Sequence, residues 1–283
     1  MKFGVVLDCL KRPLEEGIRI AGSLKLQGVQ AYATGGPFSH QGLSAEDKVF
    51  YKNLLKENGV CFSALCADMG GYGFQIEEDN AERVEKTKRI IDLAVEFGAK
   101  AITTHIGVIP SDKTEKRYKV MLDALTECGL YAKEKGVTMA IETGPEDAKT
   151  LKAFLDDTKG GVGVNLDPAN FVMVTDQDPA EAVYLLKDYI VHTHVKDGVM
   201  LNKTDPKIIY DHFACGGIDD LNTRDYFKET PVGQGSVDFK AYFKALKDIG
   251  YDGYLTIERE AGPDPEGDTK LALDYVKQVL EEI

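Results

Sequence analysis

The chain has 283 residues, of which 43% are hydrophobic and 29% are charged, and its formal net charge is −13. This length suits one large hydrophobic core, so we expect a single domain over residues 1–283. The negative charge would repel a polyphosphate backbone, and the 34 basic residues are dispersed among acids. Charge and its distribution therefore argue against the nucleic-acid-binding classes, and we expect no nucleic acid partner.

The sequence also bears on the compartment in which the chain works. The first residues show no charged leader followed by an apolar stretch, and no uncharged apolar run approaches the roughly 20 residues that span a bilayer. The five cysteines are an odd number and form no CxxC pair, which argues against a disulfide framework and against a thiolate zinc site. We expect a cytoplasmic protein with reduced cysteines and no membrane partner.

Several segments share one pattern, a helical stretch ending in glycine and followed at once by a short apolar strand. Examples are LKLQGVQAY, LKENGVCFSAL and AVEFGAKAITTH. Glycine suits the left-handed residue that ends a helix, and a strand that is apolar throughout suits a parallel sheet buried on both faces. The pattern predicts eight strands, over residues 2–7, 28–33, 60–66, 101–105, 137–142, 162–167, 190–194 and 254–258.

Amphipathic stretches separate these strands, for example over residues 80–97, where apolar residues recur at helical spacing. Eight alternating units predict an α/β protein with a single (β/α)8 TIM barrel. An open doubly wound sheet is the main alternative, but no GxGxxG follows the first strand. Residues 196–237 are too long for an ordinary connection and are predicted to be a functional loop or lid over the barrel mouth.

The last four predicted strands each end on a titratable residue: Glu142, Asp167, His194 and Glu258. In such barrels the active site lies at the carboxyl ends of the strands, so these four side chains are expected to converge. Any one acid there could instead be a solvated loop residue or a helix N-cap, but four buried together need a cation or mutual hydrogen bonds to offset their desolvation. Three oxygen donors and one nitrogen predict one divalent metal ion, with Mn²⁺ favoured and Mg²⁺, Co²⁺ and Zn²⁺ as alternatives.

His192 and His194 share one face of their strand, because side-chain direction alternates along a strand. His194 lies nearer the carboxyl end and is therefore the predicted metal ligand. His192 is expected one layer deeper, where it either hydrogen-bonds a ligand-holding residue or substrate, or is an ordinary core histidine.

Other residues near the strand ends are candidates for binding substrate. His105 ends the fourth strand, and Lys196 follows the metal histidine; a hydrogen bond within a loop and a surface ion pair are the respective alternatives. The first three strands offer polar side chains to a polyol at Asp8, Gln30 and Asp68.

At this point the sequence resembles the sugar phosphate isomerase/epimerase group of the xylose isomerase-like TIM barrel superfamily, which includes D-tagatose 3-epimerase. The resemblance covers nearly the whole chain and is carried by HIGVIP (105–110), AIETG (140–144), NLDPANFV (165–172), VHTHVKD (191–197), PVGQGSVDF (231–239) and TIERE (256–260). It implies the same four metal ligands, with Glu142 and Glu258 as the catalytic acid/base pair. The family also implies a homo-oligomer.

Two departures from the family pattern concern the substrate. Asn170 stands where the epimerases carry a histidine three residues after the metal aspartate, and their arginine shortly after the metal histidine is absent. We therefore include Asn170 among the expected substrate-binding residues. The substrate is expected to be an unphosphorylated sugar or glycoside, since the sequence shows no arginine cluster.

The resemblance implies a sugar isomerase or epimerase that removes a proton alpha to a carbonyl through a metal-stabilised enediolate. One alternative is a metal-dependent lyase that cleaves 3-oxo-glycosides by β-elimination. Weaker alternatives are an endonuclease IV-like phosphodiester hydrolase, for which five histidines are few, and a sugar sensor without catalysis.

Overall fold

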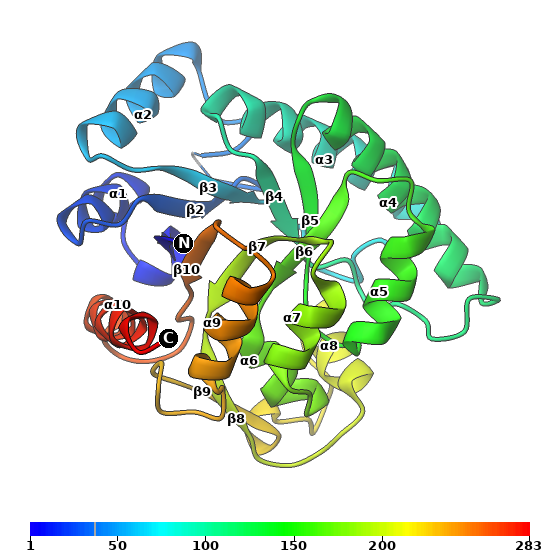
Figure 1. Cartoon of the computed structure of the whole chain (residues 1–283). Coiled ribbons are helices and arrows are strands. Elements are labelled where there is room, and N and C mark those ends of the chain that lie inside the picture. Colours follow the sequence, from blue (N-terminus) through cyan, green and yellow to red (C-terminus); the bar gives the residue numbers. More distant parts are fainter. Residues whose placement is uncertain (37) are drawn as a thin grey trace.

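The computed structural model describes residues 1–36 and 38–283 and shows eight parallel strands closed into a barrel (Figure 1). Around the barrel the strands follow the order β1, β10, β7, β6, β5, β4, β3, β2. Their bounds are β1 (Lys2–Val6), β2 (Gly28–Tyr32), β3 (Cys61–Cys66), β4 (Ala101–Thr104), β5 (Thr138–Glu142), β6 (Val162–Leu166), β7 (Ile190–Val195) and β10 (Tyr254–Ile257). The predicted (β/α)8 barrel is confirmed, and the doubly wound alternative is wrong because β1 pairs with β10.

Most helices cover the outside of this barrel, as Figure 1 shows. The helices are α1 (Leu14–Ser23), α2 (Ala45–Glu57), α3 (Glu77–Phe97), α4 (Lys116–Glu134), α5 (Ala148–Asp157), α6 (Pro168–Asn170), α7 (Pro179–Leu186), α8 (Pro206–Ala214), α9 (Phe239–Asp248) and α10 (Pro265–Glu281). Three further helical turns are η1 (Leu7–Leu10), η2 (Phe171–Thr175) and η3 (Thr223–Asp225). Strands and helices bury one continuous apolar core between them, which explains why the strands read as apolar on both faces.

The predicted helix over residues 80–97 corresponds to α3, which begins three residues earlier. Gly98 ends it in the left-handed conformation, with a φ of 78°, as the repeated pattern predicts. For the first segment, LKLQGVQAY, the prediction that glycine ends the helix is wrong. Lys25 takes the left-handed conformation after α1, with a φ of 57°, whereas Gly28 lies inside β2, where a Cβ would overlap the ring of Tyr254.

Strand register places the polar residues of the last four barrel strands at similar heights. Asn165 of β6 is paired with Glu142 of β5 and with His192 of β7. His194 of β7 is paired with Thr256 of β10. Asp167 and Glu258 follow directly after their strands, so the carboxyl ends of β5, β6, β7 and β10 carry one ring of functional side chains.

The long segment after β7 is largely structured. It contains an antiparallel pair, β8 (Asp197–Met200) and β9 (Phe227–Thr230), with α8 and η3 between the two strands. We call residues 196–237 the excursion. It contributes side chains to the pocket at the barrel mouth, whereas its movement as a lid remains a prediction.

The buried carboxylate of Asp197 fixes both ends of the excursion. It accepts hydrogen bonds from the backbone N–H groups of Gly198, Gly233, Gly235 and Val237, at 2.8, 2.9, 2.8 and 3.2 Å. The start and the return of a segment of some 40 residues are thereby held at one point beside the end of β7.

Within residues 1–36 and 38–283, no helix combines the length and apolar character that crossing a membrane requires.

Replacing Asp197 with alanine is expected to lower the free energy of unfolding by about 3 kcal/mol, because it leaves buried N–H groups without an acceptor. Urea unfolding followed by circular dichroism measures the effect. Asp123→Ala serves as a matched control, because Asp123 is an exposed residue of α4 in an i,i+4 pair with Lys119, and should change stability by less than about 0.5 kcal/mol. Equal losses in the two variants would contradict the assigned role of Asp197.

Candidate metal centre

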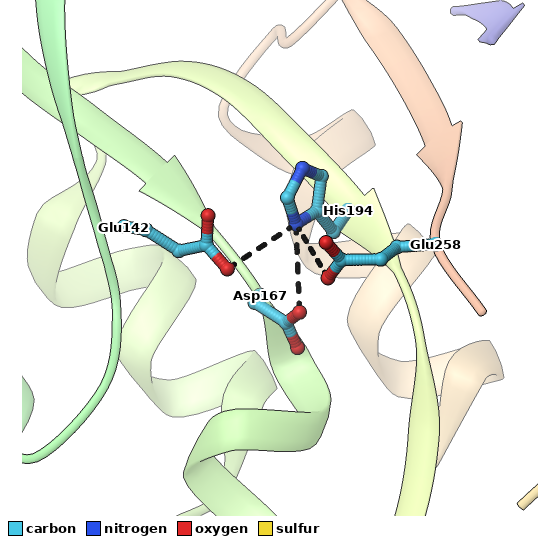
Figure 2. A group of neighbouring side chains, drawn as sticks. All are labelled: Glu142, Asp167, His194 and Glu258. Atoms are coloured by element: carbon cyan, nitrogen blue, oxygen red, sulfur yellow. Dashed lines mark ion pairs between the residues drawn. The ribbon is translucent and has the colours of Figure 1, made fainter. Parts of the chain in front are cut away.

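Four side chains meet at the carboxyl end of the barrel, as the sequence predicts. Each of Glu142, Asp167, His194 and Glu258 is buried, and each offers a ligand atom within 4.8 Å of the others. From His194 Nδ1 the distances are 3.5 Å to Glu142 Oε1, 3.5 Å to Asp167 Oδ2 and 3.1 Å to Glu258 Oε2. Figure 2 shows the three carboxylates arranged around this nitrogen, with Glu142 and Glu258 on opposite sides.

The donor set fits a divalent cation. Asp167 Oδ2 and His194 Nδ1 are buried and face each other without a hydrogen-bond partner in the part of the chain that the structure describes. A buried polar atom without a partner costs free energy, as do three neighbouring carboxylates. A cation at this point would satisfy both atoms and offset the negative charge, so these residues can hold one metal ion.

In the absence of a metal, a proton on His194 can offset part of the negative charge of the three carboxylates. Burial alone would lower the pKa of His194, but the charges of Glu258 and Glu142 outweigh it and raise that pKa well above its usual value. Burial raises the pKa of Asp167 to about 6. A cation must therefore displace a proton from His194 Nδ1.

Surrounding side chains orient the four ligands. The second ring nitrogen of His194, Nε2, lies 3.1 Å from Gln30 Oε1, so an Nε2–H donates there and leaves Nδ1 for a cation. Asp167 Oδ1 accepts from the backbone N–H groups of Ala169 and Asn170 at the start of α6, which turns Oδ2 towards the centre. Asn165 Nδ2 donates to Glu142 Oε2 at 3.2 Å.

His192 lies beneath these ligands and does not line the pocket. Burial lowers its pKa well below the usual value, so the ring is neutral. Its Nδ1–H donates to Asn165 Oδ1 at 2.8 Å, and the Thr256 hydroxyl donates to Nε2 at 3.0 Å. This matches the expected deeper layer and makes His192 a residue that positions Asn165 and, through it, Glu142. Contact of His192 with substrate stays a prediction.

Lys196 is buried in the site and is no surface ion pair. Its Nζ lies 3.0 Å from Glu258 Oε2 and 2.7 Å from Glu260 Oε2. Burial would lower the pKa of Lys196, but these carboxylates raise it well above the usual value, so it is a cation. Burial would likewise raise the pKa of Glu258, yet His194 and Lys196 hold it well below the usual range.

A second charged pair lies on the other side of the site. His105 Nδ1 is 2.9 Å from Asp68 Oδ2, and His105 Nε2 is 3.8 Å from Glu142 Oε1. Burial would lower the pKa of His105, but Glu142 and Asp68 raise it to about 10. A positively charged imidazole therefore stands beside one of the two glutamates.

A cavity of about 310 Å³ opens above the four ligand residues, with Glu142 and Glu258 in its wall. Of the residues predicted to bind substrate, those that line it are Gln30, Asp68, His105, Asn170 and Lys196. Asn170 also donates through Nδ2 to the Thr143 carbonyl. Asp8 is not among the lining residues; its carboxylate accepts from the Tyr32 backbone N–H instead.

Several residues of the site were not predicted. Asn165 could have been predicted, because it lies two residues before Asp167 and side chains two residues apart along β6 point to the same side. Tyr210 of α8 lies in the segment predicted to cover the barrel mouth, but no pattern in that segment shows which of its side chains face the cavity. Its ring lines the cavity, lies 6.0 Å from the His105 ring between centroids, and covers Gly144, where a Cβ would overlap the phenol.

With this geometry in place, comparison with known proteins identifies the family. The model of the xylose isomerase-like TIM barrel family matches residues 18–279. The chain therefore belongs to that family.

Individual relatives are more distant. An inosose dehydratase from Clostridium perfringens is 24% identical over 171 residues, covering 59% of this chain and 55% of the relative. The chain thus spans about half the length of the curated relatives it matches. A xylose isomerase domain protein from Planctomyces limnophilus is similar in structure, with a TM-score of 0.77, 25% identity and coverage of 94% and 92%. A D-tagatose 3-epimerase-like protein has a TM-score of 0.73, 20% identity and coverage of 100% and 99%, which shows the shared fold.

Saturating Mn²⁺ is expected to raise the free energy of unfolding, by about 2.7 kcal/mol at a hundredfold excess over Kd, because the folded site binds the ion. Asp167→Asn and His194→Ala should each weaken Mn²⁺ binding at least about tenfold. Calorimetric titration and thermal unfolding of the chelator-treated protein measure both effects. The control is Asp123→Asn, at an exposed position of α4. Unchanged affinity in both site variants would contradict the ligand assignment.

The buried carboxyl group of Glu146 predicts that the free energy of unfolding depends on pH. This group accepts from the Ile109 N–H at 2.6 Å, and burial raises its pKa to about 7. The folded chain therefore holds this proton where the unfolded chain has lost it, so stability falls as pH rises from about 4.5 to about 7. Glu146→Gln, which stays neutral, should gain on the order of 2 kcal/mol relative to the wild type between about pH 5 and pH 8. A pH-independent difference in urea unfolding would contradict this assignment.

Proposed function

We propose that the chain is a metal-dependent sugar isomerase or epimerase that moves a proton at the carbon next to a carbonyl group. The observation that carries the proposal is the placement of Glu142 and Glu258 on opposite sides of one cation position, at the base of a cavity (Figure 2). Two carboxylates so placed can remove a proton from one face of a bound sugar and return it from the other.

A divalent cation held by Glu142, Asp167, His194 and Glu258 would polarise the substrate carbonyl and stabilise the negative charge that develops on its oxygen. Three carboxylate donors and one imidazole favour Mn²⁺, while Mg²⁺, Co²⁺ and Zn²⁺ are alternatives for the same donor set. The identity of the ion is part of the proposal.

The chain's own groups give the two glutamates different surroundings. Lys196 Nζ lies 3.0 Å from Glu258 Oε2 and favours the ionised carboxylate, the form that accepts a proton. Glu142 lies beside the charged His105, which can donate a hydrogen bond to a substrate oxygen or to the glutamate as the proton returns. Gln30, Asp68 and Asn170 supply further donors and acceptors for hydroxyl groups at the cavity wall.

A second candidate is elimination of a group from the carbon beside the one that loses its proton, as in a dehydratase or a 3-oxo-glycoside lyase. Lys196 favours it, because a buried ammonium group that lines the cavity can hydrogen-bond to a departing oxygen and stabilise the negative charge that develops on it. The Clostridium perfringens relative, named an inosose dehydratase, also supports this candidate. Phosphodiester hydrolysis is less well supported, since the cluster of ligands holds one imidazole.

We further propose that the chain acts on a small sugar or glycoside and has no nucleic acid or membrane partner. We also propose that it forms a homo-oligomer and is cytoplasmic.

The proposal is tested by removing metal with a chelator and restoring Mn²⁺, Mg²⁺, Co²⁺ or Zn²⁺ singly. Deuterium incorporation from solvent into ketoses, aldoses, inososes and 3-oxo-glycosides is then followed by NMR. We expect metal-dependent exchange that falls at least about a hundredfold in Glu142→Gln and in Glu258→Gln. Glu127→Gln, an exposed change on α4, should leave the exchange unchanged.

The products separate the candidates. Return of the proton to the same carbon gives an epimer, return to the neighbouring carbon interconverts ketose and aldose, and release of water or of an alcohol identifies elimination. If the metal-loaded protein exchanges no proton on any of these substrates, the proposed function is wrong.

A further inference from the structure

The cavity above the metal centre has two chemically different parts. Its floor is polar and charged and comes from the barrel strands, with Glu142, His105, Lys196 and Glu258. Its upper wall comes mainly from η2 and the excursion, which contribute the apolar side chains of Met173, Val174, Ile209, Phe213 and Phe227 beside the polar groups of Tyr210, Asp211 and Glu229. Both parts line one continuous cavity of about 310 Å³, within the roughly 300–1,000 Å³ of pockets that hold drug-sized ligands.

The apolar wall combines fixed and exposed side chains. Ile209 of α8 and Met173 of η2 are buried and hold the wall in place. Phe213, one turn further along α8, is 60% exposed, the largest exposed fraction among the large hydrophobic residues that the structure describes. An exposed phenylalanine at the rim of a cavity is stabilised when an apolar group covers it.

A free sugar would leave hydroxyl groups without hydrogen-bond partners against the apolar side chains of this wall. Its hydroxyl groups need donors and acceptors, and a hydroxyl buried without one costs free energy. The floor offers such groups, whereas the side chains of Ile209, Phe213 and Phe227 offer none. A ligand that fits the whole cavity is therefore polar at one end and apolar at the other.

We propose that the excursion provides a binding subsite for an apolar, ring-sized substituent of the substrate, formed by Ile209, Phe213 and Phe227. The substrate class is then a sugar that carries such a group, as in a glycoside with an aromatic aglycone. This inference rests on the proposed function for the position of the sugar unit over the charged floor. The subsite itself includes no metal ligand.

The test uses matched pairs of phenyl and methyl β-glycosides of glucose, galactose and xylose, titrated calorimetrically into the protein with and without Mn²⁺. In at least one pair the phenyl glycoside should bind at least about tenfold more tightly, which corresponds to about 1.4 kcal/mol. Phe213→Ala should reduce that preference at least about threefold without weakening the methyl glycoside. Phe213→Leu should retain part of it, because leucine keeps an apolar side chain at the rim.

The matched control is Phe50→Ala, which removes another half-exposed phenylalanine, on α2, outside the cavity lining. It should leave the preference unchanged. The inference is overturned if no phenyl glycoside binds saturably, if phenyl and methyl glycosides bind equally, or if Phe213→Ala keeps the full preference. A self-association lost in Phe213→Ala without any phenyl preference would also overturn it, in favour of an interface between two copies.

Failure of this inference and failure of the proposed function give different results, because binding is measured without turnover. A protein that exchanges deuterium but shows no phenyl preference lacks only the subsite. A protein that prefers phenyl glycosides but exchanges no deuterium has the subsite and lacks the proposed activity.

Discussion

Mutual repulsion among buried carboxylates is the constraint on which the functional end of this barrel depends. Glu142, Asp167 and Glu258 are buried and converge within 4.8 Å of a shared imidazole. Such an arrangement is stable only if positive charge is supplied, and His194 and Lys196 supply part of it. The unsatisfied Asp167 Oδ2 shows that this compensation is incomplete in the chain alone. A metal ion held here, as proposed, would complete the charge balance, and the repulsion among these groups would favour its binding.

The same constraint explains the layer beneath the ligands. A neutral His192 and the amide of Asn165 carry hydrogen bonds from Thr256 to Glu142 without adding charge below the site. Charged groups lie instead in the cavity floor above this layer, where His105 with Asp68 and Lys196 with Glu260 flank the two glutamates. The barrel interior is therefore graded, from apolar core through neutral polar residues to a charged mouth.

A structural feature could be predicted from the sequence only where the residues around it form a recognisable pattern. The ligand positions were readable because each titratable residue ends an apolar run, and all such ends meet at one rim of a closed barrel. Backbone detail was less accessible: Lys25, not glycine, takes the left-handed position after α1, because Gly28 is needed where β2 passes the Tyr254 ring. Residues 196–237 were predicted to lie over the barrel mouth from their length, but the individual side chains that form the upper wall were not. Tyr210 and Phe213 reach the cavity only because α8 folds back over the mouth, and that packing leaves no periodic trace in the sequence.

Two neighbouring residues have different roles: Lys196 lies in the site, and Asp197 anchors the excursion. Asp197 directly follows Lys196, yet its carboxylate is taken up by the backbone of Gly198, Gly233, Gly235 and Val237. Both ends of the excursion are thereby fixed independently of what lies between them. A change in the length or side chains of the intervening residues therefore leaves these anchoring hydrogen bonds, and the barrel strands that carry Glu142 and Glu258, in place. The upper wall of the cavity could therefore be altered in this one segment without rebuilding the ring of charged groups on the barrel strands.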